Sequence, residues 1–268
     1  MKQCAIMRAM EYETLTVENP FGAPVLHVAQ TDSTMRLARE LSAAGYPDGT
    51  VIRAGYQSAG RGRIDGRTWE AAAGENLLCT ILLRRPPVRG FTLRVGLAVA
   101  KTFSRYLPPG EEARIKWPND VLIRGKKVSG ILCEADGGTL YVGTGFNLAQ
   151  RRFPPEISHK AGSLASLFPD RETPDRDRFL EAYLAELHES LRLEDWHDRV
   201  GEFLLYRGER VRFLQGDPGR REWIDGTVEG IGPDGELLLK PETSDAPACC
   251  ATVLRLFSGE IPYPDAAT

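Results

Sequence analysis

Alternating apolar and polar positions predict a mixture of helices and strands along most of the chain. Residues 34–44 carry apolar side chains at helical spacing, after a run of capping residues and before Gly45, which favours a helix end. The same period runs through 91–107 and 177–193, and a shorter helix is predicted at 161–167. Short apolar or β-branched runs bounded by turn residues predict strands at 50–57, 74–83, 113–117, 120–123, 128–133 and 140–148.

The pattern changes at Gly208, where short strands replace the mixture of helices and strands. The strands predicted there are separated by turns rich in Gly, Pro and Asp, and they lie at 210–214, 223–231, 236–240 and 252–257. Closely spaced strands of this kind are typical of small barrels. We therefore expect an α+β protein, with a mixed β-sheet packed on helices in residues 1–206 and a small β-barrel domain in residues 207–268.

The composition is that of an ordinary folded protein, since 42% of the 268 residues are hydrophobic and 26% are charged. No uninterrupted apolar run approaches the roughly 20 residues that span a bilayer, and residues 1–10 lack the apolar centre of a signal peptide. We therefore expect a cytoplasmic location and no membrane segment. A net charge of −3 argues against a general nucleic-acid binder, whose affinity would depend on a basic face.

The five cysteines form no CxxC pair and have no histidines at ligand spacing; they lie at positions 4, 79, 133, 249 and 250. We therefore expect buried or free thiols rather than disulfides or zinc ligands. No set of metal-ligating residues is predicted.

The stretch 116–134 combines a fixed cation with a hairpin. Lys116 is a charged residue at the end of a short apolar strand, and Pro118 ends the strand ladder because proline has no N–H to donate. The two strands that follow are joined by a turn at Gly125. For a single lysine, solvent exposure at a strand end is the ordinary interpretation. Its position beside this hairpin also suits a binding site for an anion.

A loop at residues 58–69 interleaves three glycines with three arginines, Gly60, Gly62 and Gly66 with Arg61, Arg63 and Arg67. Backbone freedom combined with guanidinium groups, which match carboxylate and phosphate geometry, predicts an anion-binding lid. The alternatives are a solvated surface loop or an Arg/Gly segment that binds RNA, although such segments repeat their motif at length. The residue order is not that of a P-loop.

Two other features each allow two interpretations. The hydroxyls of Ser33 and Thr34 either only cap the helix that follows or face a ligand at its N-terminus. Gly143 and Gly145 lie on one face of a predicted strand, where they permit close approach of a ligand or mark a bulge or tight packing. The pattern alone does not choose between these interpretations.

Taken in order, these motifs resemble those of the biotin protein ligases, which attach biotin to the carrier domains of carboxylases. The resemblance extends over roughly residues 28–262. Its most specific part is Lys-Trp-Pro-Asn-Asp at 116–120 followed by Lys-Val-Ser-Gly-Ile-Leu at 127–132. The other matching motifs lie at 31–34, 57–63, 66–69, 74–77, 143–147 and 258–261.

The resemblance implies a fold and a set of site residues. In that family a class II synthetase-like catalytic domain, a mixed sheet packed on helices, is followed by an SH3-like β-barrel. The resemblance implies that Lys116, Arg61 and Arg63 act in catalysis, the lysine meeting the biotin carboxylate and the α-phosphate. The implied biotin-binding residues are Ser33, Thr34, Gln57, Gly60, Arg61, Lys116, Val121, Gly130 and Gly143. The implied nucleotide-binding residues are Arg63, Trp69, Lys116, Asn119 and Asn147.

The activity that the resemblance implies is ATP-dependent ligation. Biotin would be activated as biotinyl-5′-AMP and transferred to a lysine of a biotin carboxyl carrier protein, such as that of acetyl-CoA carboxylase, with ATP and biotin as substrates and Mg²⁺ on the phosphates. Family members that also repress genes carry an N-terminal winged helix-turn-helix, for which residues 1–28 are too few. We therefore expect a ligase that does not bind nucleic acid or a membrane. A homodimer is left open.

The chain departs from the family pattern at two places: Met35 stands where asparagine is usual, and Ile64-Asp65 lengthens the lid. The nearest alternative is a lipoate protein ligase, which shares the fold and the adenylate chemistry but lacks this spacing of motifs. A biotin-binding regulator without catalytic activity is a second alternative. Lys116 together with the arginine loop disfavours it, because acid activation at a triphosphate needs cations that offset the repulsion between two anions.

Overall fold

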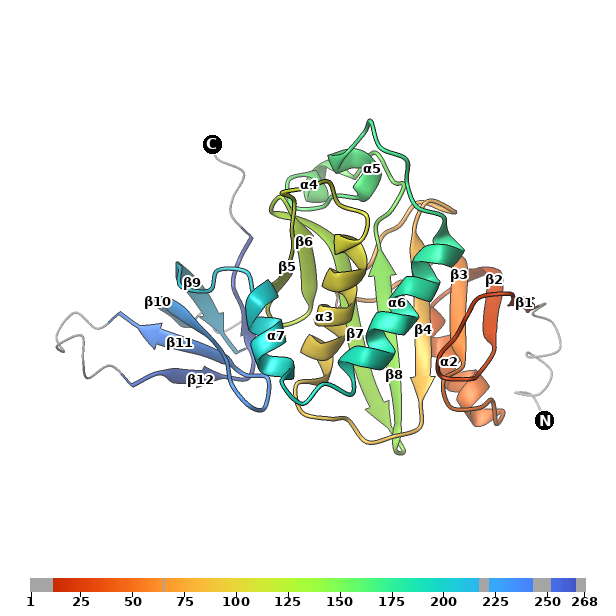
Figure 1. Cartoon of the computed structure of the whole chain (residues 1–268), viewed down its shortest axis with the longest axis horizontal. Helices are drawn as coiled ribbons and strands as arrows, with labels where there is room; N and C mark the ends of the chain where they lie inside the picture. Colours follow the sequence, from red (N-terminus) through yellow and green to blue (C-terminus); the bar gives the residue numbers. More distant parts are fainter. Residues whose placement is uncertain (1–11, 65, 217–221, 243–251, 264–268) are drawn as a thin grey trace.

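The computed structural model describes residues 12–64, 66–216, 222–242 and 252–263 (Figure 1). Its largest element is an eight-stranded sheet with the strand order β1-β2-β3-β4-β8-β7-β6-β5. Strands β2 and β3 are parallel, and the other neighbouring pairs are antiparallel, so the sheet is mixed as predicted. The strands are β1 Glu13–Leu15, β2 Val25–Thr31, β3 Val51–Gln57, β4 Leu77–Leu83, β5 Ala113–Lys116, β6 Asp120–Ile123, β7 Lys126–Asp136 and β8 Thr139–Phe146.

Helices cover both faces of this sheet. α3 (Phe91–Ser104) and α6 (Arg176–Ser190) cross one face, with α7 (Trp196–Phe203) packed against α3 (Figure 1). α2 (Thr34–Ala43) belongs to a second apolar cluster, built from the opposite side chains of β2, β3 and β4. Because β4 is covered on both sides, all seven of its residues are buried and its sequence is continuously apolar rather than alternating.

The small second sheet has five antiparallel strands in the order β12-β11-β10-β9-β13. It packs against the large sheet through Trp117, whose ring lies 5.9 Å from that of Phe213 and whose Nε1 donates to the Gly235 carbonyl oxygen at 3.0 Å. The predicted arrangement of a mixed sheet followed by a small β domain is therefore confirmed. The strands are β9 Arg210–Gln215, β10 Glu222–Ile231, β11 Leu237–Pro241, β12 Leu254–Leu256 and β13 Gly259–Glu260.

Several elements differ from the sequence prediction. α3 ends at Ser104 and α6 at Ser190, because the residues after them form turns rather than a further helical turn. The short helix predicted at 161–167 is α5 (Leu164–Leu167), and α4 (Pro155–Ser158) precedes it without having been predicted. β1, β2 and α7 were also missed, since none of them shows a sustained apolar period.

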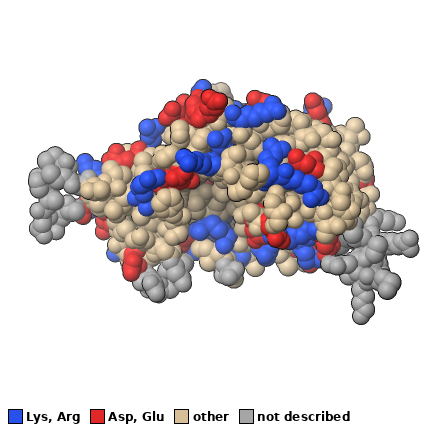
Figure 2. Space-filling model, turned by 90° about the horizontal axis from the view of Figure 1, so that it is seen from below, with Lys and Arg blue, Asp and Glu red and all other residues tan. Residues whose placement is uncertain are grey.

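The described thiols Cys79 and Cys133 are unpaired, as expected, and burial raises the pKa of each to about 12. Cys4, Cys249 and Cys250 lie outside the described residues, as do the first eleven residues and most of the turn predicted between the strands at 210–214 and 223–231. Among the described helices, none has the length and apolar content needed to cross a membrane. On the face shown in Figure 2, basic and acidic side chains are interspersed.

Candidate active site

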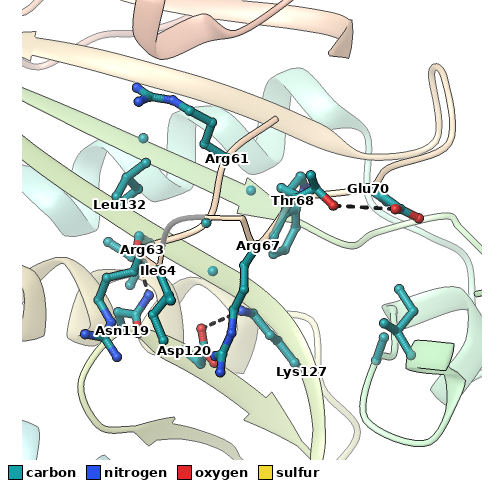
Figure 3. A pocket seen from close by; sticks show the side chains of 18 of the residues that line it. Arg61, Arg63, Ile64, Arg67, Thr68, Glu70, Asn119, Asp120, Lys127 and Leu132 are labelled. Atoms are coloured by element: carbon teal, nitrogen blue, oxygen red, sulfur yellow. Dashed lines mark hydrogen bonds and ion pairs between the residues drawn. The ribbon is translucent and has the colours of Figure 1, made fainter. Parts of the chain in front are cut away.

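A cavity of about 630 Å³ lies where the arginine loop, strands β5 to β8 and the end of the small sheet meet (Figure 3). It falls within the range of small-molecule sites. All the predicted site residues except Gly60 and Val121 line it: Ser33, Thr34, Gln57, Arg61, Arg63, Trp69, Lys116, Asn119, Gly130, Gly143 and Asn147. Segments far apart in the sequence therefore converge on one site.

Gly60 and Val121 lie outside the cavity lining. Val121 is fully buried in the apolar core that α3 covers, so its position does not support the predicted contact with biotin. Gly60 lies in the loop beside Trp69, whose backbone N–H donates to the Gly60 carbonyl oxygen at 3.0 Å. A Cβ at Gly60 would be 2.5 Å from the Trp69 carbonyl oxygen, so this glycine permits the two arms of the loop to approach closely.

Lys116 ends β5 and is only 3% exposed, which contradicts the interpretation of a solvated strand-end lysine. Burial lowers the pKa of its ammonium group to about 8, while Asp120 and Glu260 act in the opposite direction. Within the described parts of the chain, no hydrogen bond or ion pair is made by Lys116 Nζ. A buried cation without a direct counter-ion is costly for folding and is typical of a site that binds an anion.

Asp120 pairs with Lys116 in strand register, but its carboxylate oxygens bind other groups. Tyr263 donates its hydroxyl to Oδ2 at 2.5 Å, and Lys127 Nζ lies 2.6 Å from Oδ1. Burial alone would raise the pKa of the Asp120 carboxyl, but Lys127, Lys116 and the bond from Tyr263 hold it below its ordinary value. Asp120 is therefore a fixed anion beside two cavity lysines.

The arginine loop is tied to both sheets. Arg67 forms a two-pronged ion pair with Glu260 of β13, both distances being 2.9 Å, and the Arg63 guanidinium donates to the Gly259 carbonyl oxygen at 3.2 Å. Arg61 pairs with Glu134 of β7 at 3.3 Å. Figure 3 shows Arg67 extending towards Asp120 and Lys127, whereas Arg61 points the opposite way. The three guanidinium groups thus surround the cavity from different sides. Asp65, part of the lengthened lid, lies outside the described residues.

Trp69 lies over a pair of glycines that face each other across β7 and β8. A Cβ at Gly130 would be 2.7 Å from the indole ring, and a Cβ at Gly145 would be 2.5 Å from it. The ring also lies 5.5 Å from Lys127 Nζ, within cation–π range. The two glycines therefore leave the sheet surface bare where the aromatic ring packs against it.

The N-terminus of α2 contributes a polar cluster. Ser33 is the N-cap residue, yet its side chain makes no cap hydrogen bond, so capping alone does not account for it. The Gln57 amide oxygen accepts from the Thr34 N–H at 2.7 Å and from the Thr34 hydroxyl at 2.9 Å. With its oxygen so occupied, Gln57 has its NH₂ group to offer a ligand. Met35 packs beside Gly143, where an added Cβ would be 2.8 Å from the thioether sulfur.

The side chains of the two predicted asparagines, Asn119 and Asn147, also donate hydrogen bonds to backbone carbonyl oxygens. Asn119 donates to the Ile131 carbonyl oxygen at 2.9 Å and holds the turn that follows Lys116. Asn147 donates to the Gly162 carbonyl oxygen at 3.0 Å, and its own amide oxygen is buried without a partner among the described residues. An unsatisfied buried acceptor of this kind suits a ligand that brings a donor.

The cavity residues that were not assigned a role from the sequence include Asp120, Lys127, Glu260 and Tyr263. Asp120, Lys127 and Glu260 lie within the motifs at 116–120, 127–132 and 258–261, so the sequence already marked these positions. Tyr263 had no signal, because only the packing of the small sheet brings it to the cavity.

The comparison with known proteins decides the family. Residues 27–146 match the model of the Biotin/lipoate A/B protein ligase family. The chain is 38% identical over 227 residues to a biotin–[acetyl-CoA-carboxylase] ligase of Mycobacterium tuberculosis, covering 79% of this chain and 81% of that protein. The chain belongs to this family.

Two further relatives of the ligase family agree with this. The bifunctional ligase/repressor BirA of Bacillus spizizenii is 29% identical over 251 residues, which cover 90% of this chain and 74% of that protein. The solved structure of the biotin protein ligase from Aquifex aeolicus, in complex with biotin and ATP, has a TM-score of 0.73 and 28% identity, and covers 89% of this chain and 97% of that chain. The family match ends before Glu260 and Tyr263.

Proposed function

We propose that the chain is an ATP-dependent biotin protein ligase that forms biotinyl-5′-AMP and transfers biotin to a lysine of a biotin carboxyl carrier protein. The observation that carries this proposal is the buried, unpaired Lys116 in a cavity ringed by three arginines, in a chain of this family. The cavity would surround the carboxylate of the acid and the phosphate of ATP with cations, as acid activation requires.

Biotin is assigned to the part of the cavity between α2 and β8. The Gln57 amide, the Ser33 and Thr34 hydroxyls and the glycine face at Gly143 supply polar and apolar contacts there. The nucleotide is assigned to the part lined by Trp69 and Asn147, where an aromatic face and a buried amide oxygen match the stacking surface and the amino group of adenine. Lys116 lies where both anions would meet.

In the first step, a biotin carboxylate oxygen attacks the α-phosphorus of ATP, the bond to the β-phosphate breaks, and pyrophosphate leaves. Lys116 and the lid arginines stabilise the charge that develops in this displacement. In the second step, the amine of the carrier lysine attacks the acyl carbon, loses a proton, and displaces AMP. The chain contributes chiefly by holding the reactants in position.

Magnesium enters this scheme as the ion on the ATP phosphates, where it needs few protein ligands. The described residues hold no group of three or more His, Cys, Asp or Glu that could form a metal site by themselves. When bound, the ion offsets phosphate charge during the displacement.

The remaining parts of the proposal concern organisation and surroundings. We assign residues 1–206 to the catalytic domain and 207–268 to the small β domain, a division supported by the beginning of β9 at Arg210. The carrier is the expected macromolecular partner, without nucleic acid or a membrane, and a homodimer is left open. A cytoplasmic location is consistent with the absence of a membrane-spanning helix among the described residues.

Mass spectrometry of a carrier domain tests the proposal. After incubation with the protein, MgATP and biotin, the carrier should gain one biotinyl group, because the activated acid has a single specific acceptor lysine. Pyrophosphate exchange with biotin and with lipoate as the acid separates the two ligase types covered by the family description. Exchange with lipoate but not with biotin would show that the chain is a lipoate ligase. Absence of exchange with either acid would refute a ligase function.

Replacing Arg63 should weaken retention of the intermediate more than the fold. The side chain of Arg63 lines the cavity and makes one bond to β13, so Arg63→Gly should release biotinyl-adenylate and increase labelling of a bystander albumin by about tenfold. Bystander biotinylation is measured by blotting. Arg192→Gly, an exposed arginine after α6, is the matched control and should leave labelling at the parent level. Equal labelling by the two variants, with adenylate formation intact, would contradict a retention role for Arg63.

A further inference from the structure

Tyr263 joins the small sheet to the charged groups at the cavity centre. It lies three residues beyond β13, its hydroxyl donates to Asp120 Oδ2 at 2.5 Å, and its ring centroid is 4.4 Å from Lys116 Nζ. The face of a phenol ring attracts an ammonium group at this distance. A single side chain therefore contacts both the buried cation and its neighbouring carboxylate.

The Tyr263 hydrogen bond decides which groups Asp120 can bind. Oδ2 accepts from Tyr263 and Oδ1 pairs with Lys127, so both carboxylate oxygens are engaged away from Lys116. Lys116 and Asp120 are nevertheless register partners on β5 and β6, which makes Asp120 a neighbouring anion within reach of a side-chain rotation. Without Tyr263, a direct ion pair between these two residues would become available.

We propose that Tyr263 is a positioning residue, which holds Asp120 away from Lys116 and covers one side of the ammonium group, so that Lys116 keeps its donors for the anionic groups of the substrates. The role of Lys116 towards substrates rests on the proposed ligase function. A carboxylate bound directly to Lys116 would compete with the biotin carboxylate and the α-phosphate for the same charge. The small sheet thereby controls a charge at the reaction centre.

Chemical labelling of Lys116 tests this proposal without any catalytic readout. The intact protein is treated briefly with acetic anhydride from neutral to alkaline pH, and acetylation of Lys116 is measured by peptide mass spectrometry. In the parent, labelling should rise with a midpoint near pH 8, set by burial together with Asp120, Glu260, Lys127 and Arg67. In Tyr263→Phe, Asp120 can approach the ammonium and stabilise it, so the midpoint should move higher and labelling at pH 8 should fall about fivefold.

Two other variants distinguish positioning from a general structural effect. Asp120→Asn removes the competing charge and should move the Lys116 midpoint in the opposite direction, to lower pH. Tyr106→Phe is the matched control, because this half-buried tyrosine stacks on Phe179, makes no side-chain hydrogen bond within the described residues and does not line the cavity. It should leave the midpoint unchanged. Loss of packing alone would not move the two cavity variants in opposite directions.

Biotin-dependent pyrophosphate exchange provides the second readout. Tyr263→Phe should raise the KM for biotin about tenfold with a smaller change in kcat, and the effect should largely vanish when Asp120→Asn is already present. An unchanged labelling midpoint in Tyr263→Phe, or a KM effect that persists in the Asp120→Asn background, would overturn the positioning role. If the parent protein showed no pyrophosphate exchange, the ligase function would be refuted but the positioning role of Tyr263 would not. The labelling midpoints would still decide that role.

Discussion

Lys116→Met should lose adenylate formation by about a hundredfold or more while making the protein more stable at pH 7. The loss follows from removing a fixed cation at the point where the acid and the phosphate meet, the class of contribution typically worth several kcal/mol in the transition state. The gain follows from removing a charge that burial disfavours, because Lys116 is 3% exposed and its pKa falls from 10.5 to about 8. At ~1.4 kcal/mol for each pKa unit, that shift corresponds to about 3 kcal/mol.

The stability difference between parent and variant should depend on pH in a defined direction. Below pH 8 Lys116 is protonated in both the folded and unfolded parent, so the penalty for burying the charge is complete. Between pH 8 and 10.5 the unfolded chain binds more protons at this site than the folded one, so the stability of the parent rises with pH. The advantage of Lys116→Met should therefore shrink across this window.

Urea unfolding of both proteins across this pH range measures the difference, and pyrophosphate exchange measures the activity. Lys240→Met, in β11 and outside the cavity lining, is the matched control and should change neither quantity. A variant that is less stable than the parent at pH 7 would show that Lys116 contributes packing rather than a strained charge. Adenylation at the parent rate would refute its catalytic role.

The fold was predictable where burial on both sides of a strand leaves a plain apolar run. β4 and β6 are buried along their whole lengths, and both were found from that pattern. β2 was missed because it is buried on both faces at Val25 and Leu26 and exposed at Ala29 and Gln30, which leaves neither a continuous run nor a regular alternation. Whether such a segment forms a strand depends on the strand it pairs with. Pairing between distant segments cannot be read from the local sequence.

The site was predictable where its chemistry lies within short motifs. Lys116 was recognisable as a charged residue among apolar neighbours, and the loop arginines as charged residues among glycines. All of them line the cavity. The bond from Tyr263 to Asp120 joins residues far apart in the chain, and it depends on how the small sheet packs against Trp117. Val121 was given a ligand contact from its motif position alone, and its side chain lies in the buried core, so that contact stays a prediction.

Gly145→Ala should displace Trp69 and weaken ATP binding by about tenfold to a hundredfold, the range that loss of one aromatic stacking partner produces. The added methyl carbon would lie 2.5 to 2.8 Å from three indole atoms, closer than non-bonded carbons approach. The ring has little room to shift, because it already lies close against Gly130 of the sheet and the Gly60 carbonyl oxygen holds the Trp69 backbone N–H. The indole must therefore leave the glycine pair. Nucleotide affinity is measured by calorimetry with a non-hydrolysable ATP analogue.

Gly96→Ala in α3 provides the matched control for this substitution. Its added methyl carbon would meet the Ile115 side chain at an ordinary 3.5 Å, and alanine favours a helix by roughly 1 kcal/mol over glycine, so nucleotide affinity should be unchanged and the fold slightly more stable. Biotin affinity should fall less than nucleotide affinity in Gly145→Ala, because Thr34 and Gln57 lie on α2 and β3, respectively, rather than under the indole. Equal losses for both ligands would indicate collapse of the whole cavity. Unchanged nucleotide affinity would show that the ring on the glycine pair plays no part in holding ATP.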